Sequence, residues 1–393
     1  MAAKLNDSLL VKDGLVFDPI SRSFRRQDIR VQHGKIQRVR EAIQPTSGEG
    51  IVQASNNLVL PGLIDFHLHC FRYGEVLSID VDALAPRAGT TTFVDAGSTG
   101  SLNFLAFREY VIKPSVTRIF AFLNISAIGL TSVGGIGIDF AENDDDRLLN
   151  VPSAAEVIEK NRDIIVGVKV RAYTGLRTLT ALTRARALAD LVSLPIMVHI
   201  ASGPPHFADV LPFLKPGDIV THVYHGGGDS LLDGNGRVRD VFKEARTRGI
   251  EFDVGLDRVH TDFTVTRAGV DQGFTPHYLS TDLAIPNRHV TVDMATTISK
   301  FVALGLSLEE ALVRATYAPA LKLGKEKEFG ILSEGSDADI GIFELRDGNF
   351  SFSDTYGNTI QAEKRLVPLA TIRKGVILAP NERETVKYDF VIK

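Results

Sequence analysis

The middle of the chain alternates between short apolar runs and longer stretches with helical periodicity, and this alternation constrains the fold more than any other feature. Helical patterns fill the intervals, for example at residues 182–192 and 238–249. The eight apolar runs are LPGLIDFHLH (60–69), TTTFVDAG (90–97), RIFAFLNISAIGL (118–130), IIVGVKVRAY (164–173), LPIMVHIA (194–201), DIVTHVYHG (218–226), IEFDVGL (250–256) and HYLSTDL (277–283). Buried strands that alternate with helices are typical of a parallel sheet, and eight of them are typical of a closed barrel. We therefore predict an α/β fold, a (β/α)8 TIM barrel.

Both ends of the chain have a different pattern, that of short antiparallel strands. SLLVKDGLVFD and DIRVQHGKIQRVRE alternate with period two around Asp-Gly and His-Gly turns, and DADIGIFEL, PLATIRKGVIL and VKYDFVIK are rich in β-branched residues. We expect residues 1–57 and 331–393 to form one small β-sandwich domain. Residues 58–330 would then form the catalytic barrel.

Composition narrows the class of protein. Lys and Arg number 44 against 48 Asp and Glu, a net charge of -4 that favours neither nucleic acid nor an anionic membrane surface as a partner. No run of about 18 apolar residues is present, so we expect no membrane span. The single cysteine, Cys70, excludes an intrachain disulfide and suits a reducing compartment. We expect a cytoplasmic protein.

Polar residues recur where the predicted barrel strands end. Barrel enzymes carry their reactive groups at the carboxyl ends of the strands, so these residues are candidates for one site. His67 and His69 lie two apart on the first strand and therefore share a face. The full set is His67, His69, Lys169, His199, His222 and Asp282. A single strand histidine is more often a structural group than a ligand, but four histidines, one lysine and one aspartate at ordered strand ends together predict a metal site.

The residue types indicate which metal and how many ions. Imidazole and carboxylate without thiolate favour Zn²⁺, with Mn²⁺, Fe²⁺ or Co²⁺ as alternatives. Lys169 lies among Val and Ile, where an unpaired ammonium is costly. Reaction of its neutral amine with CO₂ would give an N6-carboxylated lysine, a carbamate with two oxygens that can bridge two metals. We therefore expect two divalent ions, and we do not count Cys70 as a ligand, because it alternates with His69.

These motifs together resemble those of the amidohydrolase superfamily. The resemblance rests on PGLIDFHLH, GVKVR, MVHI, VTHVYHG, STD and GILSEGSDADIGIF, and it spans nearly the whole chain. It implies that His67, His69 and Asp282 hold one metal, His199 and His222 hold the other, and carboxylated Lys169 bridges them. It also implies that Asp282 passes a proton from a metal-bridging hydroxide to the leaving group.

Within the superfamily, the chain resembles the dihydroorotase-like, or amidohydrolase/deacetylase, branch. The resemblance implies hydrolysis of an amide or ester, in an N-acyl amino acid or an O-acyl hydroxy acid. A cyclic amidase of the dihydroorotase or hydantoinase type is the alternative. The chain departs from the branch after the seventh strand, where Leu256 and Asp257 replace an expected His-Gly and put substrate contacts of that loop in doubt.

Substrate contacts are expected around the barrel mouth. Arg171 lies two residues beyond Lys169, where it could pair with a substrate carboxylate or with an acid of the barrel. Arg72, Tyr73 and His225 follow the first and sixth strands and are further candidates. We expect a small, carboxylate-bearing substrate and a homo-oligomeric protein.

Two other classes remain as alternatives. A mononuclear deaminase on the same barrel would typically lack the strand lysine, so Lys169 argues against it. A non-catalytic scaffold would have lost some of the ligand positions, whereas all six are filled here.

Overall fold

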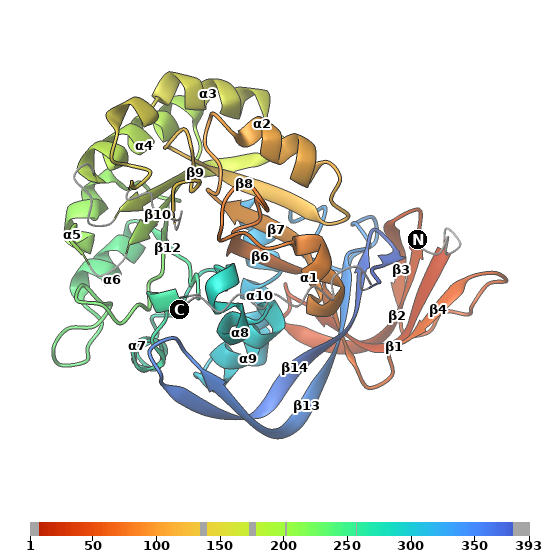
Figure 1. The fold of residues 1–393 in the computed structure, drawn as a ribbon. Coiled ribbons are helices and arrows are strands. Elements are labelled where there is room, and N and C mark those ends of the chain that lie inside the picture. The colour runs from red at the N-terminus through yellow and green to blue at the C-terminus, as the bar shows by residue number, and fades with distance from the viewer. Residues whose placement is uncertain (1–7, 134–139, 173–177, 201–202, 257, 380–393) are drawn as a thin grey trace.

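Two sheets organise the protein in the computed structural model, which describes residues 8–133, 140–172, 178–200, 203–256 and 258–379. Figure 1 shows a curled parallel sheet surrounded by helices, with a second sheet beside it that is built from the two ends of the chain. The predicted strand VKYDFVIK and residue Asp257 lie outside the described residues.

The first sheet has seven parallel strands in sequence order. They are β6 (Leu63–Leu68), β7 (Thr90–Ala96), β8 (Arg118–Asn124), β9 (Ile165–Ala172), β10 (Ile196–Ile200), β11 (Ile219–Thr221) and β12 (Glu251–Phe252). The eighth predicted run forms no regular strand, but it makes single parallel bridges to both edges, Asp253 with Tyr278 and Leu68 with Leu283. The sheet is therefore curled like a TIM barrel, with segment 278–283 between its edge strands.

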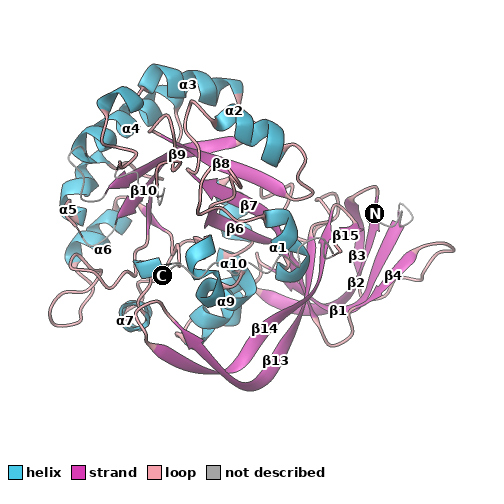
Figure 2. Ribbon diagram, viewed as in Figure 1, coloured by secondary structure: helices cyan, strands magenta, loops and turns pink. Residues whose placement is uncertain are grey.

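Helices lie on the outer side of the curled sheet (Figure 2). They are α1 (Val81–Ala88), α2 (Phe104–Phe107), α3 (Val151–Lys160), α4 (Thr178–Val192), α5 (Phe207–Val210), α6 (Asp240–Thr247), α7 (Phe263–Asp271), α8 (Arg288–Thr291), α9 (Met294–Ala303), α10 (Leu308–Arg314) and α11 (Tyr317–Lys322). Short 3-10 turns occupy Asp146–Leu148, Leu211–Phe213, Arg258–His260 and Ile285–Asn287, and a π-helical turn occupies Arg108–Ile112. No helix in the described part of the chain is long and apolar enough to cross a membrane.

A packed apolar core fills the interior of the curled sheet away from the carboxyl ends of its strands. The polar groups lie at those carboxyl ends. Phe66, Phe122 and Met197 belong to this core. A Cβ on Gly167 would lie 2.3 Å from the ring of Phe122, so glycine makes room for that ring. Lys169 is two residues beyond Gly167 and therefore faces the same interior, nearer the mouth.

The second sheet confirms that the two ends of the chain pair with each other. Its strands are β1 (Ser8–Asp18), β2 (Ser23–Gln32), β3 (Lys35–Arg40), β4 (Gly50–Gln53), β5 (Leu58–Pro61), β13 (Ile340–Ser353), β14 (Thr359–Arg373) and β15 (Val376–Ile377). The described strands form one hydrogen-bonded sheet in the order β15-β14-β13-β5-β1-β2-β3, with β4 also paired to β1. β5 leads through Gly62 directly into β6, so a single residue separates the two sheets at this crossing.

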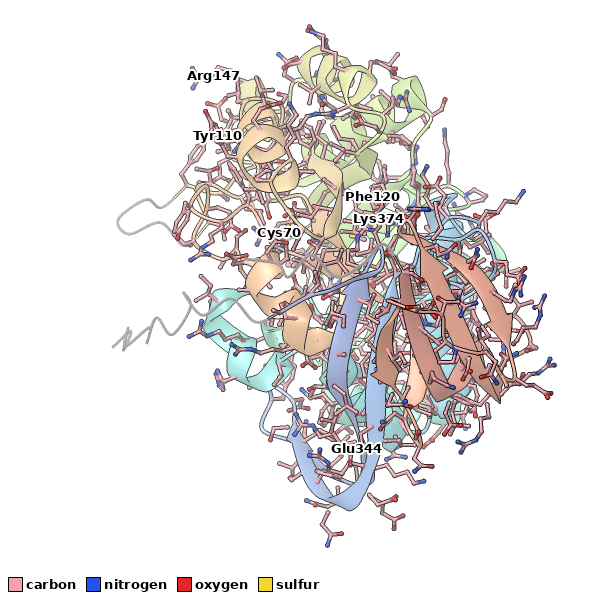
Figure 3. The ribbon with its side chains drawn as sticks, turned by 90° about the vertical axis from the view of Figure 1, so that its right-hand side faces the viewer. Cys70, Tyr110, Phe120, Arg147, Glu344 and Lys374 are labelled. Atoms are coloured by element: carbon pink, nitrogen blue, oxygen red, sulfur yellow. The ribbon has the colours of Figure 1, made fainter. Side chains whose placement is uncertain are left out.

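The β13–β14 hairpin extends from this sheet along the barrel. Figure 1 shows it passing α9 toward α7, and Figure 3 shows it from the side, with Glu344 on it. The backbone N–H of Leu366 donates to Ser299 Oγ of α9 at 2.9 Å, and Phe352 packs with Phe263 of α7. The hairpin is therefore fixed to the barrel helices α7 and α9.

Candidate metal centre

The first cluster of metal-ligand groups joins the end of β6 to segment 278–283. Asp282 Oδ1 lies 3.3 Å from His67 Nε2 and 3.2 Å from His69 Nε2, and all three residues are buried. Asp282 N donates to His67 O at 2.6 Å, which fixes the carboxylate beside the first strand. The structure thus brings together the three residues that the family resemblance assigns to one metal.

A second cluster, of three imidazoles, adjoins the first. His222 Nε2 lies 2.9 Å from His199 Nδ1, and the ring of His260 stacks on that of His222 at 3.8 Å between centroids. Ligand atoms of all three lie within 4.8 Å of one another. His222 Nδ1 lies 3.0 Å from Gly255 O, an arrangement that turns Nε2 toward the other histidines. His199 and His222 were predicted here, whereas His260 was not.

Lys169 lies between the sheet interior and the first cluster. Its side chain is buried, with Nζ 3.1 Å from His67 Nε2 and 3.6 Å from Met197 Sδ. Burial lowers the pKa of Lys169 to about 8. A larger fraction of the amine is therefore neutral near neutral pH than in an exposed lysine, and only the neutral amine can react with CO₂.

The charge states of the ligands suit a cation. Burial keeps the pKa values of His69, His199 and His222 below that of an exposed histidine, so these rings are neutral and have a lone pair to donate. Burial opposes ionisation of Asp282, but His67 and His260 outweigh it and hold the pKa of that carboxyl well below its usual range.

His67 behaves differently from the other histidines. Burial and the Lys169 ammonium oppose its protonation, but the carboxylates of Asp282 and Asp253 outweigh them and raise its pKa.

Asp282 Oδ1 is buried without a hydrogen-bond partner among the described residues, although it lies between two imidazole nitrogens. A buried, unsatisfied carboxylate oxygen beside imidazoles fits a divalent metal ion.

Neighbouring polar groups contact the Nδ1 atoms of the two imidazoles in the first cluster. Asp253 Oδ2 lies 3.0 Å from His67 Nδ1 and accepts a hydrogen bond from Thr221 Oγ1 at 2.7 Å. Ser98 Oγ lies 2.9 Å from His69 Nδ1. Partners of this kind orient metal-binding imidazoles and leave the other ring nitrogen for the metal.

Two residues of the site have left-handed backbone conformations. His222 has a φ of 65° and Asp282 a φ of 48°. Such values are uncommon outside glycine and cluster at functional sites. His222 directly follows β11 and Asp282 lies in segment 278–283, so both turns occur at the carboxyl end of the curled sheet.

The predicted substrate residues are placed in three different surroundings. Arg171 pairs with buried Glu142 at 3.2 Å, which is the alternative that its position left open. It is close enough to help lower the pKa of His199. His225 is 4% exposed, and burial lowers its pKa to about 4. Arg171 is therefore near His199 and His225 near His260, and their roles toward substrate stay predictions.

Arg72 and Tyr73 lie apart from the two clusters. Arg72 pairs with Asp80, and its guanidinium lies 4.7 Å from the ring centroid of Tyr73, which is exposed. Both residues line a cavity of about 450 Å³ to which Cys70 also contributes, and none of the six predicted metal-site residues lines it. Their assignment as substrate contacts stays a prediction.

The loop after β12 supplies the residue that sequence reasoning missed. Leu256 is buried, Asp257 lies outside the described residues, and His260 follows in the 3-10 turn. His260 Nδ1 lies 2.9 Å from Asp282 Oδ2. The sequence signal that could have identified His260 was the presence of a histidine in the loop after the seventh apolar run. In that loop, Leu256 and Asp257 replace the expected His-Gly.

The chain is similar to known proteins over most of its length. The profile of the amidohydrolase family matches residues 58–378. A protein named deacetylase from Brucella anthropi is 32% identical over 368 residues, which cover 90% of this chain and 89% of that protein. A solved structure described as a dihydroorotase is 30% identical, with a TM-score of 0.86 over 95% of this chain and 98% of that one.

A second solved structure, described as an adenine deaminase, is 28% identical with a TM-score of 0.86 over 95% of this chain and 99% of that one. The family profile covers most of the chain, and the two clusters lie at the strand ends that it includes. The chain belongs to the amidohydrolase family and is a metal-dependent hydrolase.

Proposed function

We propose that the protein removes an acyl group from an N-acyl amino acid or an O-acyl hydroxy acid. The carrying observation is the position of Asp282, whose Oδ1 lies within 3.3 Å of two imidazole nitrogens while Oδ2 lies 2.9 Å from His260. This carboxylate can contact a metal on one side and a proton-exchanging group on the other. The relative named deacetylase supports an acyl substrate.

Two zinc ions are proposed as the cofactors. His67, His69 and Asp282 would hold one ion, His199 and His222 the other, and N6-carboxylated Lys169 would bridge them. When bound, the ions would activate a water molecule and polarise the scissile carbonyl. The lowered pKa and the burial of Lys169 support the carbamate.

The remaining steps fall to side chains of this chain. Asp282 accepts the proton of the attacking water and delivers it to the leaving nitrogen or oxygen, because it is the ionised carboxylate at the centre of the site. Arg171 and His225 would orient the substrate, and the guanidinium of Arg171 would contact a substrate carboxylate in addition to Glu142. Arg72 and Tyr73, on the loop that follows β6, would contact the substrate farther from the metal site.

A substrate screen tests this proposal. Metal-loaded protein is assayed with N-acetyl amino acids and O-acetyl hydroxy acids in both configurations, and with dihydroorotate and hydantoins. We expect turnover of at least one acyl substrate. Ring opening alone would instead establish the cyclic amidase, which the similar structure described as a dihydroorotase favours.

The role of Lys169 has its own test. Lys169→Ala should lower bound zinc from two ions per chain toward one or none, because the bridging ligand is lost. Short carboxylic acids should restore part of the metal and the activity by occupying the vacated position. Two bound ions in the variant without added acid would contradict the bridge.

The finer architecture and the setting of the protein are also part of the proposal. We propose that segment 278–283 is the eighth strand of a closed (β/α)8 barrel, that the second sheet folds into a small β-sandwich, and that the protein is a cytoplasmic homo-oligomer. Its partner would be a small carboxylate-bearing substrate, with no nucleic acid or membrane involved. The single bridges of segment 278–283 to both edge strands support the closure.

A further inference from the structure

The turn at the tip of the β13–β14 hairpin, residues 354–358, lies against two loops of the barrel mouth. Tyr356 Oη accepts a hydrogen bond from Gly226 N at 3.1 Å and donates one to Val259 O at 2.6 Å. Gly226 directly follows His225, and Val259 directly precedes His260. One hydroxyl from the second sheet therefore joins the loops that follow β11 and β12.

The same turn makes further contacts with the loop after β12. Asp354 Oδ2 accepts from Phe263 N at 2.8 Å, and Asn358 Nδ2 donates to Asp262 Oδ1 at 3.3 Å. The other oxygen of Asp354 accepts from Tyr356 N at 2.9 Å and from Asn358 N at 2.8 Å. The turn is thus closed by its own aspartate and holds the loop at both ends of residues 259–263.

The fit between turn and loops is close. A Cβ on Gly226 would lie 2.6 Å from Asp262 Oδ2 and 3.1 Å from Tyr356 Cε1, so a larger residue there would have to displace these side chains. Phe352 anchors the hairpin below the turn by packing with Phe263. The turn is therefore seated on the mouth loops by shape as well as by hydrogen bonds.

The held loop leads directly to the proposed proton carrier. His260 Nδ1 lies 2.9 Å from Asp282 Oδ2, and the His260 ring stacks on His222 at 3.8 Å. We propose that Tyr356 is a positioning residue, whose hydroxyl fixes the loop that carries His260 and, through His260, the carboxylate of Asp282. This inference rests on the proposed function, because it gives the hairpin a role in that same site.

Amide hydrogen exchange tests the structural half of the inference in the metal-loaded protein. Tyr356→Phe keeps the ring and removes both hydrogen bonds of the hydroxyl. The exchange rates of Gly226 and of residues 259–263 should rise about fivefold or more, since one hydrogen bond contributes roughly 1 kcal/mol to an equilibrium. Ser351→Ala is the matched control, because it removes a hydrogen bond within the same hairpin, to Gln361. Unchanged exchange in Tyr356→Phe would overturn the inference.

A double-mutant cycle tests the functional half, with the acyl substrate that turns over fastest in the screen. Tyr356→Phe should lower kcat about fivefold and leave KM within about twofold, because Asp282 acts in the transition state. In a His260→Ala background, Tyr356→Phe should lower kcat no further. An equal loss in both backgrounds would show that Tyr356 does not act through His260, and would overturn the role.

The exchange experiment and the double-mutant cycle together distinguish a failure of this inference from a failure of the proposed function. If the wild-type protein turns over none of the substrates, the proposed function fails. The exchange experiment then still decides whether the hydroxyl of Tyr356 holds the mouth loops. If the wild type is active but Tyr356→Phe changes neither exchange nor kcat, only the positioning role fails.

Discussion

Replacing Asp253 by asparagine should weaken zinc binding although Asp253 is not itself proposed as a ligand. Asp253 is fully buried, and its oxygens contact three neighbours: His67 Nδ1 at 3.0 Å, Thr221 Oγ1 at 2.7 Å and Ser280 Oγ at 2.6 Å. Asparagine preserves the volume and one acceptor oxygen but removes the charge that would make His67 a stronger ligand.

The size of the effect follows from what is lost. A hydrogen bond to a charged group contributes about 1.5–3 kcal/mol and a neutral one about 0.5–1.5 kcal/mol, so the substitution removes roughly 1–1.5 kcal/mol. That difference corresponds to about tenfold weaker zinc binding. Competition with a chromophoric chelator measures the zinc dissociation constant of each variant.

Asp218→Asn is the matched control for the loss of a buried carboxylate. Asp218 is also buried, and it accepts from Ile196 N at 2.8 Å, Lys215 N at 2.7 Å and Arg186 Nη1 at 2.6 Å. It lies just before β11, at the end of the strand opposite the metal site. This variant should lose stability but bind zinc within about twofold of the wild type. Unchanged zinc affinity in Asp253→Asn, or equal losses in both variants, would refute the reasoning.

Three further predictions concern the ligands and the pH dependence. Asp282→Asn should preserve the circular dichroism spectrum and lower turnover on the order of 10²–10⁴-fold, because it removes the proton carrier; near wild-type turnover would contradict that role. Gly255→Ala places a Cβ 2.5 Å from His222 Nδ1 at a φ of +51°, so elemental analysis should find one zinc ion fewer; two ions would contradict the second cluster. Burial and nearby arginines lower the pKa of His277 to about 4, and its Nδ1 accepts from Phe252 N at 2.9 Å. The neutral ring therefore stabilises the fold above about pH 6.5, and this stabilisation should fall toward pH 4 by on the order of 1–3 kcal/mol. Denaturant unfolding of the wild type and of His277→Asn across this pH range measures the difference in their free energies of unfolding. A difference that does not change with pH would contradict the prediction.

The proposed ligands could be grouped from the sequence because parallel strands bring their carboxyl ends to one place. His67, His69, Lys169 and His199 occupy such ends, so identifying the apolar runs was enough to group them. Asp282 was found in the same way, although its segment forms no regular strand.

The irregularity of that segment could not be predicted, and its cause is a side chain. Asp65 accepts hydrogen bonds from Thr281 N at 3.0 Å and Thr281 Oγ1 at 2.6 Å. A backbone N–H that donates to a carboxylate does not donate to a neighbouring strand, so the regular ladder is interrupted there. Nothing in the apolar pattern of HYLSTDL distinguishes this case from an ordinary strand.

Contacts between distant segments account for the other omissions. His260 and Asp253 belong to the site through contacts with Asp282 and His67. The histidine in the loop after the seventh run was a signal for His260, but nothing in the sequence indicates which groups His260 and Asp253 contact. Tyr356 reaches the mouth only because the β13–β14 hairpin crosses α9. A sequence pattern predicts which elements form, but such crossings depend on how they pack.

Zinc titration of metal-free protein tests the central claim, that hydrolysis depends on metal held by these two clusters. The protein is stripped with a chelator, and acyl-substrate hydrolysis in bicarbonate buffer is followed as zinc is added. We predict no turnover without metal and a maximum at two equivalents of zinc per chain. Full turnover by the metal-free protein would contradict the claim.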